Sequence, residues 1–257
     1  MTSIWVWALP WIVVPMVALW GYSVVRRDAS VVDVFWGPGF GVLAVVYHWG
    51  AASSGVRPAL ALAAVLLWAL RLGLHLGVRW VGKGDEDYRY AQMRARHGDG
   101  FWWVSLWTVF LLQAGLIWLL SWPILAAIAS PGMPGLVGWA GVVVFLAGFL
   151  FEAVADQQLR RFRRDPARRG MVLDSGLWRY SRHPNYFGDA LLWWGLWLMA
   201  ADAGAWWTVF APVTMTLLLL RVSGVPLLEP HLTESRPRYA AYVRRTSAFV
   251  PWPPRKE

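Results

Sequence analysis

Long apolar stretches separated by short polar segments run along the whole chain. A helix that crosses a bilayer needs about 20 consecutive, mainly apolar residues, and seven stretches reach or approach that length. They fall at about residues 4–25, 31–49, 58–80, 101–129, 135–152, 186–201 and 203–221. The pattern predicts an all-α integral membrane protein, a seven-transmembrane helix bundle forming a single domain over residues 1–257, with a tail at 222–257.

The composition supports this prediction. Hydrophobic residues make up 58% of the 257 residues, tryptophan occurs 21 times and the mean hydropathy is +0.42, values typical of integral membrane proteins. The absence of cysteine excludes disulfides, thiolate metal sites and cysteine nucleophiles, and we predict no metal site. The first apolar stretch is too long for the core of a cleavable signal peptide and no basic segment precedes it. We therefore expect it to be the first span.

The distribution of positive charge predicts the orientation. The formal net charge is +9, and all 24 Lys and Arg except Arg57 and Arg71 lie in the first, third and fifth loops or the tail. By the positive-inside rule, the N-terminus is outside and the C-terminus is cytoplasmic. We expect a multi-pass protein of a bacterial inner membrane whose active site opens to the cytoplasm. Because topology explains the charge, we predict no nucleic-acid partner.

Several ionisable side chains lie inside the predicted spans, where they are costly and usually face a polar cavity. Three polar pairs are spaced four residues apart, so each pair shares one helical face. We expect these faces to line one cavity open to the cytoplasm. The alternative is structural pairing between helices, for instance of Arg71 with Asp33 or Glu152. The residues concerned are Asp33, Arg71, His75, Glu152, Asp156, Asn185 and Asp189.

The run GLWRYSRHPNYFGD at Gly176 to Asp189 leads directly into an apolar stretch and holds the only asparagine, Asn185. Pro184 suits the first position of a helix, whose N-terminus carries unpaired N–H groups and a positive dipole end. Beside Arg179, Arg182 and His183, this end predicts an anionic ligand.

Arginines follow Asp156 in the fifth loop, and guanidinium groups suit phosphate oxygens. Arg160 and Arg163 are placed to clamp a phosphate, although topology and anionic lipid head groups are the alternative explanation. The tail carries Glu229 and His231 near the membrane and is amphipathic and basic. It is either an interfacial helix or a cap over the ligand cavity.

Six segments together resemble one family. They are VDVFWGPG (Val32 to Gly39), GKGDEDYRY (Gly82 to Tyr90), EAVADQQLRRFRRDP (Glu152 to Pro166), the GLWRYSRHPNYFGD run, LLEPHL and SAFVPWPP. The chain resembles the bacterial, DUF1295-type membrane reductases of the steroid 5α-reductase family. That resemblance implies a seven-helix fold that binds NADPH from the cytoplasmic side. It also implies an oxidoreductase acting on CH–CH groups, which reduces the C=C bond of an enone in the manner of a 3-oxo-5α-steroid 4-dehydrogenase.

The resemblance assigns the family's cofactor residues to Asn185 and Asp189, to Asp156 with Arg160 and Arg163, to the tail residue His231 and to Arg71. With them we predict as NADPH-binding the neighbouring residues Glu152, Arg179, Tyr180, Arg182, His183 and Glu229. Asp33 corresponds to the family's second-span acid. We expect it to lie in apolar surroundings, protonated, and to donate to the substrate ketone.

The family's third-span tyrosine has no counterpart here, since Trp68 lies near its expected place. Either another donor, Tyr186 or His75, takes that catalytic role, or the substrate is not a 3-oxo-4-ene steroid. Aromatic and aliphatic walls would accept a flat, apolar substrate that enters from the bilayer, with membrane lipids as the other partners.

A second enzyme class shares the R-H-P-x-Y run, the membrane methyltransferases of the isoprenylcysteine carboxyl methyltransferase type. Their cofactor, S-adenosylmethionine, is cationic at sulfur and carries no phosphate. The arginines after Asp156 and the spacing of Asn185 and Asp189 favour NADPH. A lipid-binding or structural membrane protein is the third possibility.

Overall fold

The computed structural model describes residues 1–222, 229, 233 and 236–255. The described residues form helices, turns and loops, with no β-strand among them. The chain divides into two compact units. Unit 1 comprises Met1–Gly138 and Met199–Ala211, and unit 2 comprises Trp139–Leu198 and Pro212–Glu257. The prediction of a single domain stays a prediction, and each unit is described by itself.

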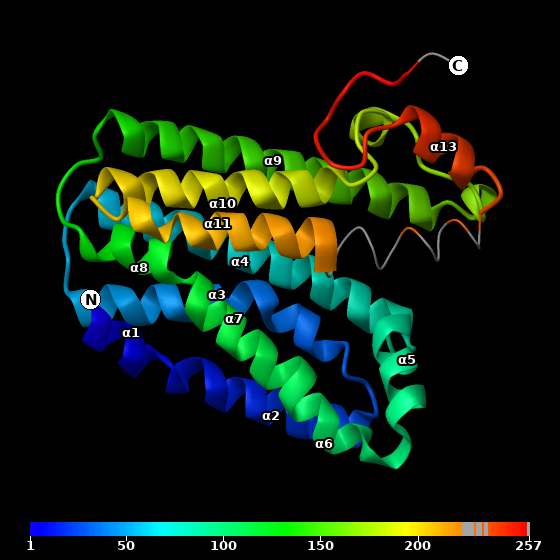
Figure 1. Cartoon of the computed structure of the whole chain (residues 1–257), viewed down its shortest axis with the longest axis horizontal. Helices are drawn as coiled ribbons and strands as arrows, with labels where there is room; N and C mark the ends of the chain where they lie inside the picture. Colours follow the sequence, from blue (N-terminus) through cyan, green and yellow to red (C-terminus); the bar gives the residue numbers. More distant parts are fainter. Residues whose placement is uncertain (223–228, 230–232, 234–235, 256–257) are drawn as a thin grey trace. The chain divides into compact units, whose positions relative to one another are not determined.

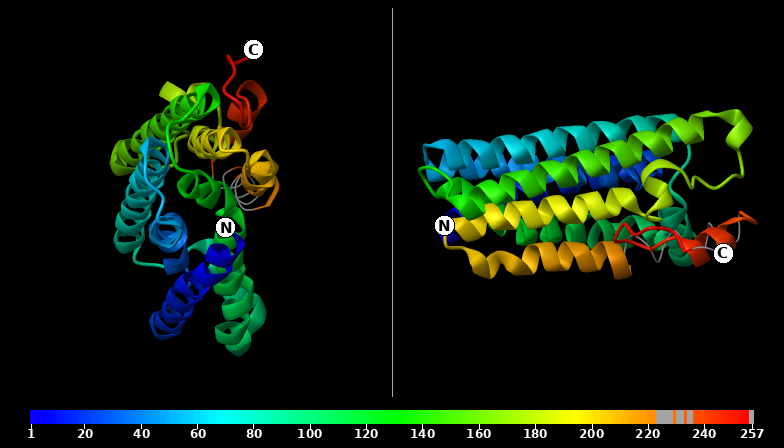
Figure 2. Two further views of the ribbon diagram at one scale, coloured as in Figure 1. Left: turned by 90° about the vertical axis from the view of Figure 1, so that its left-hand side faces the viewer. Right: turned by 90° about the horizontal axis from the view of Figure 1, so that it is seen from above.

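Unit 1 is built around α3, which contacts α1, α2, α4, α7 and α8. Figure 2 shows α3 and α4 running side by side. The contact is close because small residues face it: a Cβ added at Gly37 would lie 3.2 Å from Cβ of Leu72, and one at Gly41 would lie 3.1 Å from Cβ of Ala69. The helices of this part are α1 (Thr2–Ala8), α2 (Pro10–Arg26), α3 (Val31–Ala51), α4 (Val56–Lys83), α5 (Tyr88–His97), α6 (Phe101–Ser105), α7 (Leu112–Leu120) and α8 (Trp122–Ala129), with the π-helical turn η2 (Leu106–Leu111) and the short 3₁₀ turns η1 (Gly98–Gly100) and η5 (Trp206–Val209).

Arg57, one of the two basic residues outside the positive-inside pattern, ties loops of unit 1 together. Its guanidinium lies 2.9 Å from the carboxylate of Asp202 and donates to the carbonyl of Met133 at 2.9 Å. The same carboxylate accepts the N–H of Gly135 at 2.8 Å. Arg57 therefore has a structural partner in this unit, which explains its position outside the basic loops.

Unit 2 is organised by a backbone contact between α9 (Leu136–Arg164) and α10 (Pro184–Asp202), which lie side by side in Figure 1. A Cβ added at Gly148 would lie 2.4 Å from N of Leu192, and one at Gly188 would lie 2.4 Å from N of Glu152. Glycine is required there because no side chain fits between the backbones, as at small-residue contacts between membrane helices. The other helices are α11 (Phe210–Leu217), which unit 1 shares at its start, the π-helical turn η6 (Leu218–Val222), the 3₁₀ turns η3 (Pro166–Arg168) and η4 (Gly176–Arg179), and α13 (Tyr239–Arg245).

Among the described residues, five helical segments are long and apolar enough to cross a membrane: Thr2–Arg26, Val31–Ala51, Val56–Lys83, Tyr88–Ala129 and Leu136–Arg164. They match the first five predicted spans, so the all-α, multi-pass class is supported. The predicted sixth span lies within α10, and the seventh overlaps a shorter apolar helix, Trp206–Val222. The predicted loop between the third and fourth spans proves to be helical over α5.

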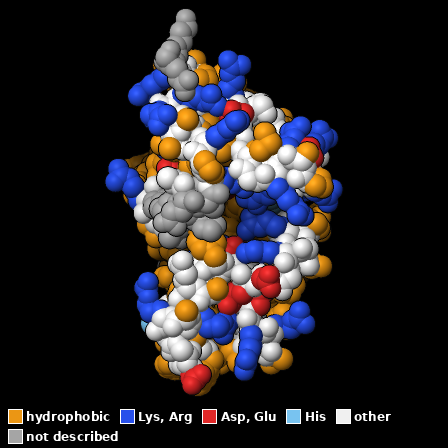
Figure 3. Space-filling view, turned by 90° about the vertical axis from the view of Figure 1, so that its right-hand side faces the viewer, with side chains coloured by type: hydrophobic (Ala, Val, Ile, Leu, Met, Phe, Trp, Pro, Cys, Tyr) orange, Lys and Arg blue, Asp and Glu red, His pale blue; other side chains and the backbone are white. Residues whose placement is uncertain are grey.

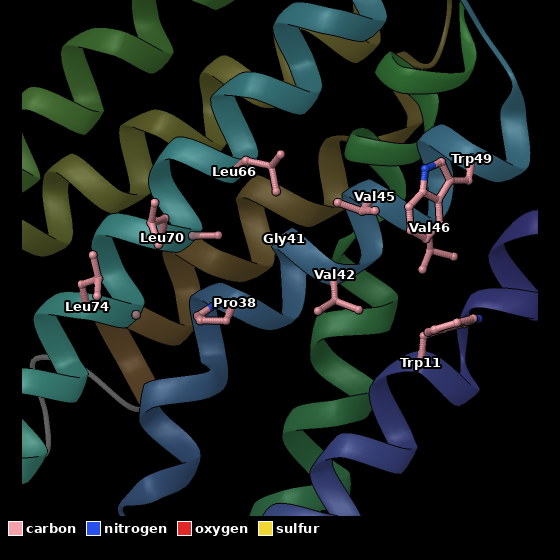
Figure 4. A pocket seen from close by; sticks show the side chains of 12 residues that line it. Trp11, Pro38, Gly41, Val42, Val45, Val46, Trp49, Leu66, Leu70 and Leu74 are labelled. Atoms are coloured by element: carbon pink, nitrogen blue, oxygen red, sulfur yellow. The ribbon is translucent and has the colours of Figure 1, made fainter.

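An apolar groove of about 570 Å³ lies on the α2, α3 and α4 side of unit 1 (Figure 4). Pro38 and Gly41 line it on α3, and Leu66, Leu70 and Leu74 line it on α4. The last three leucines are between 37% and 64% exposed, as expected for helix faces that meet acyl chains. Asp33 does not line this groove, so the acid lies elsewhere on α3.

Candidate functional site

Asp33 lies in the first turn of α3 and accepts hydrogen bonds from two residues of α5. Nη2 of Arg89 lies 2.5 Å from Oδ2, and the hydroxyl of Tyr90 donates to Oδ1 at 2.7 Å. The side chains of Asp33 and Arg89 are 22% and 24% exposed. The expectation of apolar surroundings for Asp33 is therefore wrong, because two polar donors converge on it. Both groups are donors, and the two Asp33 oxygens accept one hydrogen bond from each.

Two acids of the GKGDEDYRY segment anchor α5 to the loop before α3. Asp87 caps α5 by accepting the N–H of Arg89 at 3.2 Å, and its own N–H donates to Oγ of Ser30 at 2.7 Å. Glu86 accepts the N–H of Ala29 at 2.8 Å. Burial alone would raise the pKa of Asp87, but the hydrogen bonds and charge of Arg89 lower it. The segment thus fixes the position from which Arg89 and Tyr90 reach Asp33.

In unit 2, the α9 and α10 contact brings predicted cofactor residues together. Nδ2 of Asn185 donates to Oδ1 of Asp156 at 3.1 Å. Because the backbone of Glu152 lies against Gly188, Glu152 and Asp189 are at the same level of this helix pair. Glu152, Asp156 and Asp189 are all buried, at 4%, 6% and 9% exposure. The structure therefore joins the two motifs that flank the fifth loop.

Arg182 and His183 precede α10 and hold Glu229 of the tail. Nε of Arg182 lies 2.7 Å from Oε1 of Glu229, and Nε2 of His183 lies 3.1 Å from the same oxygen. Arg182 also donates to the carbonyls of Val243 and Thr246, at 3.1 and 2.7 Å. Burial alone would raise the pKa of Glu229, but hydrogen bonds from His183 and Arg182 lower it to about 2. These contacts, named here the tail clamp, give Arg182, His183 and Glu229 protein partners.

Two tyrosines of α13 surround the tail clamp. The hydroxyl of Tyr242 donates to the carbonyl of Trp178 and, at 3.2 Å, to that of Ser181. Burial raises the pKa of Tyr242, and burial together with the charge of Glu229 raises the pKa of Tyr239 to about 12. The hydroxyl of Tyr242 thus fastens α13 to the segment before α10, whereas the hydroxyl of Tyr239 interacts with Arg182.

The predicted phosphate-binding arginines lie at the surface. Arg160, Arg163 and Arg179 are exposed, and Arg160 donates to Gln157. Tyr180 is 42% exposed, and its carbonyl accepts the N–H of Trp252 at 2.9 Å. In the face drawn in Figure 3, Lys and Arg are the commonest charged side chains. An exposed guanidinium can turn toward a phosphate that arrives from solution, so these positions remain compatible with the predicted role.

Similarity to known proteins extends over most of the chain. Residues 19–246 match the family described as a protein of unknown function, DUF1295. The chain belongs to the DUF1295 family. An uncharacterized protein of Schizosaccharomyces pombe (strain 972), C594.04c, is 27% identical over 263 residues, covering 91% of this chain and 75% of that protein. No solved structure matches the chain.

The DUF1295 match covers the Asp33 contacts of unit 1 and the Asn185–Asp156 contact of unit 2. Arg71 and His75 are half-buried on α4 of unit 1, and Tyr186 of unit 2 stacks on His183 with ring centroids 5.4 Å apart. Trp68 is fully buried in the core of unit 1. His231 lies outside the described residues. The expected single cavity would be lined by polar pairs from both units. It stays a prediction.

Sequence reasoning missed two residues of this DUF1295 protein, Arg89 and Tyr90. Their signal was present in GKGDEDYRY, which contributed only to the resemblance. In place of the family's third-span tyrosine, the sequence offers Tyr186 and His75, which lie on predicted helices. The hydroxyl that meets Asp33 instead comes from α5, 57 positions away in the chain.

Proposed function

We propose that this DUF1295 protein is an NADPH-dependent reductase of the C=C bond of an enone in an apolar, steroid-like substrate. The proposal includes a seven-span bundle with the N-terminus outside and the C-terminus in the cytoplasm. Its main support is the hydrogen bond between Asn185 and Asp156. It links the two segments that the resemblance to steroid 5α-reductases assigns to the cofactor. Membership of the DUF1295 family, which is associated with such membrane proteins, is the second support.

The residues around α10 fit a dinucleotide phosphate. α10 begins at Pro184, and its first turn presents N–H groups that have no partner within the helix. Exposed Arg160 and Arg163, on the last turns of α9, suit phosphate oxygens. Asp156 and Asp189 offer carboxylate acceptors for ribose hydroxyls. We assign Arg182 and Glu229 to positioning, since the tail clamp already uses their hydrogen-bonding groups.

The cofactor, when bound, supplies a hydride for the β-carbon of the enone. The protein must then stabilise negative charge on the carbonyl oxygen, and the α-carbon must gain a proton. We assign donation to the carbonyl oxygen to Tyr90, because its hydroxyl already donates to Asp33. The proton for the α-carbon then comes from water as the enol returns to the ketone. A substrate carbonyl that replaces Asp33 as acceptor receives the Tyr90 hydrogen bond. Asp33 meanwhile keeps Arg89 in place.

Cofactor binding tests the proposal on the full chain in lipid nanodiscs. We expect the purified protein to bind NADPH and not S-adenosylmethionine, and to oxidise NADPH when a 3-oxo-4-ene steroid or a smaller enone is added. Binding of S-adenosylmethionine alone would replace the reductase with the methyltransferase. Binding of neither would overturn both enzyme functions.

A matched pair of variants tests the site. Asn185→Ala removes the amide beside Asp156, and we expect the Kd for NADPH to rise about tenfold, as for loss of one hydrogen bond to a charged group. Ser175→Ala is the control, because Ser175 is exposed in the same unit and its side chain makes no capping hydrogen bond. Equal affinity in Asn185→Ala and Ser175→Ala would exclude Asn185 from the cofactor site.

A further inference from the structure

A basic pocket of about 430 Å³ lies in unit 2 between the end of α13 and the segment that follows it. Four arginines line it, together with Thr246, Ser247 and Trp252, and no acidic side chain of the described residues does. The four are Arg182, Arg244, Arg245 and Arg255. Arg244, Arg245 and Arg255 belong neither to the predicted NADPH-binding residues nor to the residues of the proposed reductase reaction.

Hydrogen bonds fold the segment after α13 back onto residues 180–182 and fix the pocket wall. The N–H of Arg182 donates to the carbonyl of Ser247 at 2.8 Å, and Oγ of Ser181 donates to that of Phe249 at 2.8 Å. The N–H of Arg255 closes the turn by donating to the carbonyl of Arg245 at 2.9 Å. Phe249 is buried at 9% exposure. The pocket is therefore preformed, which lowers the entropic cost of binding a ligand.

The charges of the pocket are only partly compensated. Arg182 is paired with Glu229, and Arg245 is paired with Asp174 on the surface. Arg244 and Arg255 are exposed and have no acidic partner within the described residues. Two positive charges are thus available to a ligand. Guanidinium groups bind phosphate oxygens with two parallel hydrogen bonds, so the pocket suits a phosphate group.

The rim of the pocket indicates where the phosphate comes from. Trp252 lines the pocket with the four arginines and is 69% exposed, and Val250, two residues before it in the chain, is 57% exposed. Tryptophan next to basic residues is typical of the boundary between lipid head groups and acyl chains. We propose that this pocket binds the phosphate of an anionic phospholipid head group, with Trp252 and Val250 entering the boundary layer. The proposal is independent of the reductase function.

Lipid titration of the full chain tests the proposal. Phosphatidylglycerol and phosphatidylcholine are added separately to detergent-purified protein, and bound lipid is counted by native mass spectrometry. The pocket variant carries Arg244→Gln with Arg255→Gln, and we expect its Kd for phosphatidylglycerol to rise about 30-fold. The control carries Arg164→Gln with Arg169→Gln, two exposed arginines of the same unit. It loses the same charge, and we expect a rise of about twofold or less.

Two further measurements separate the sources of the phosphate. We expect Trp252→Ala to weaken phosphatidylglycerol binding and to leave inorganic phosphate binding unchanged. Inorganic phosphate that binds as tightly as the lipid would overturn the lipid assignment, as would equal losses in the pocket and control variants. Equal binding of the two lipids would have the same consequence. Loss of NADPH affinity in the pocket variant would place the pocket in a cofactor site instead, whereas failure of all NADPH binding leaves the lipid result unaffected.

Discussion

Asp156 of unit 2 meets its partner through a helix contact made of glycines, whereas Asp33 of unit 1 meets its partners through long side chains. The amide of Asn185 reaches Asp156 because Gly148 and Gly188 let the backbones of α9 and α10 touch. Asp33 receives the guanidinium of Arg89 and the hydroxyl of Tyr90 from α5. Asp156 is positioned by a close helix contact at glycines that have no side chains, whereas Asp33 is positioned by the side chains of Arg89 and Tyr90.

This difference determines how a substitution destabilises each region. A side chain added at a glycine contact must push two helix backbones apart, so the damage spreads along the helix pair. Asp33, Arg89 and Tyr90 form the Asp33 cluster. Removing the side chain of Arg89 or Tyr90 deletes one hydrogen-bond donor and leaves the backbone in place. We therefore expect large, general losses of stability in the first region and small, local losses in the second.

Gly188→Ala is expected to have the largest effect. Its Cβ would lie 2.4 Å from N of Glu152 and 2.8 Å from O of Gly148, atoms that cannot move independently. We expect a loss of about 1–3 kcal/mol in the free energy of unfolding, measured by denaturant titration in detergent micelles. Gly115→Ala on α7 is the control, since no atom lies within 4 Å of the added Cβ. A Gly188→Ala protein as stable as Gly115→Ala would contradict the backbone contact.

Glu229→Gln tests the charged fastening of unit 2. We expect a loss of about 1–2 kcal/mol at neutral pH, less than for a fully buried pair because Glu229 keeps contact with solvent. The pKa of Glu229 is lowered to about 2 in the folded protein. The wild type therefore keeps this advantage above about pH 4.5, the ordinary pKa of the group, and loses it as the pH falls toward 2.

Thermal unfolding of the wild type and Glu229→Gln across this pH range measures that loss. Asp165→Asn is the control, because Asp165 of the same unit also pairs with an arginine, Arg168 at 2.9 Å, but its side chain is 41% exposed. We expect the difference between wild type and Glu229→Gln to shrink at acidic pH, and no such trend for Asp165→Asn. A difference that stays constant down to pH 2 would exclude the tail clamp as its source.

Sequence patterns predicted the local features of both regions and missed their long-range pairings. The start of α10 at Pro184 and the first five spans follow from local residue preferences and hydropathy. The sequence shows Gly148 and Gly188, but it does not show which backbone each of them contacts. Arg89 is 56 positions from Asp33, and Arg182 is 47 positions from Glu229. Helical periodicity places a side chain on a face of its own helix and does not choose its partner.

Arg89→Met tests the Asp33 cluster. It keeps much of the apolar stem and removes the guanidinium that pairs with Asp33 and Asp87. We expect a loss of about 1 kcal/mol in the free energy of unfolding, because the pair is partly exposed. Arg96→Met on the same helix is the control, since Arg96 is exposed. A loss as large as that of Gly188→Ala would show that unit 1 also depends on a single contact.

Tyr90→Phe is expected to change stability least and function most selectively. The ring still fills its buried position, and the hydroxyl's hydrogen bonds with Asp33 and Gln113 are lost, which costs about 0.5–1 kcal/mol. If Tyr90 donates to the substrate carbonyl, kcat for enone reduction falls about 100-fold while the Kd for NADPH is unchanged. Tyr22→Phe is the control, because Tyr22 is an exposed tyrosine of the same unit. Wild-type kcat in Tyr90→Phe, together with normal NADPH binding, would remove Tyr90 from the reaction and leave the Asp33 cluster as a fastening of α5.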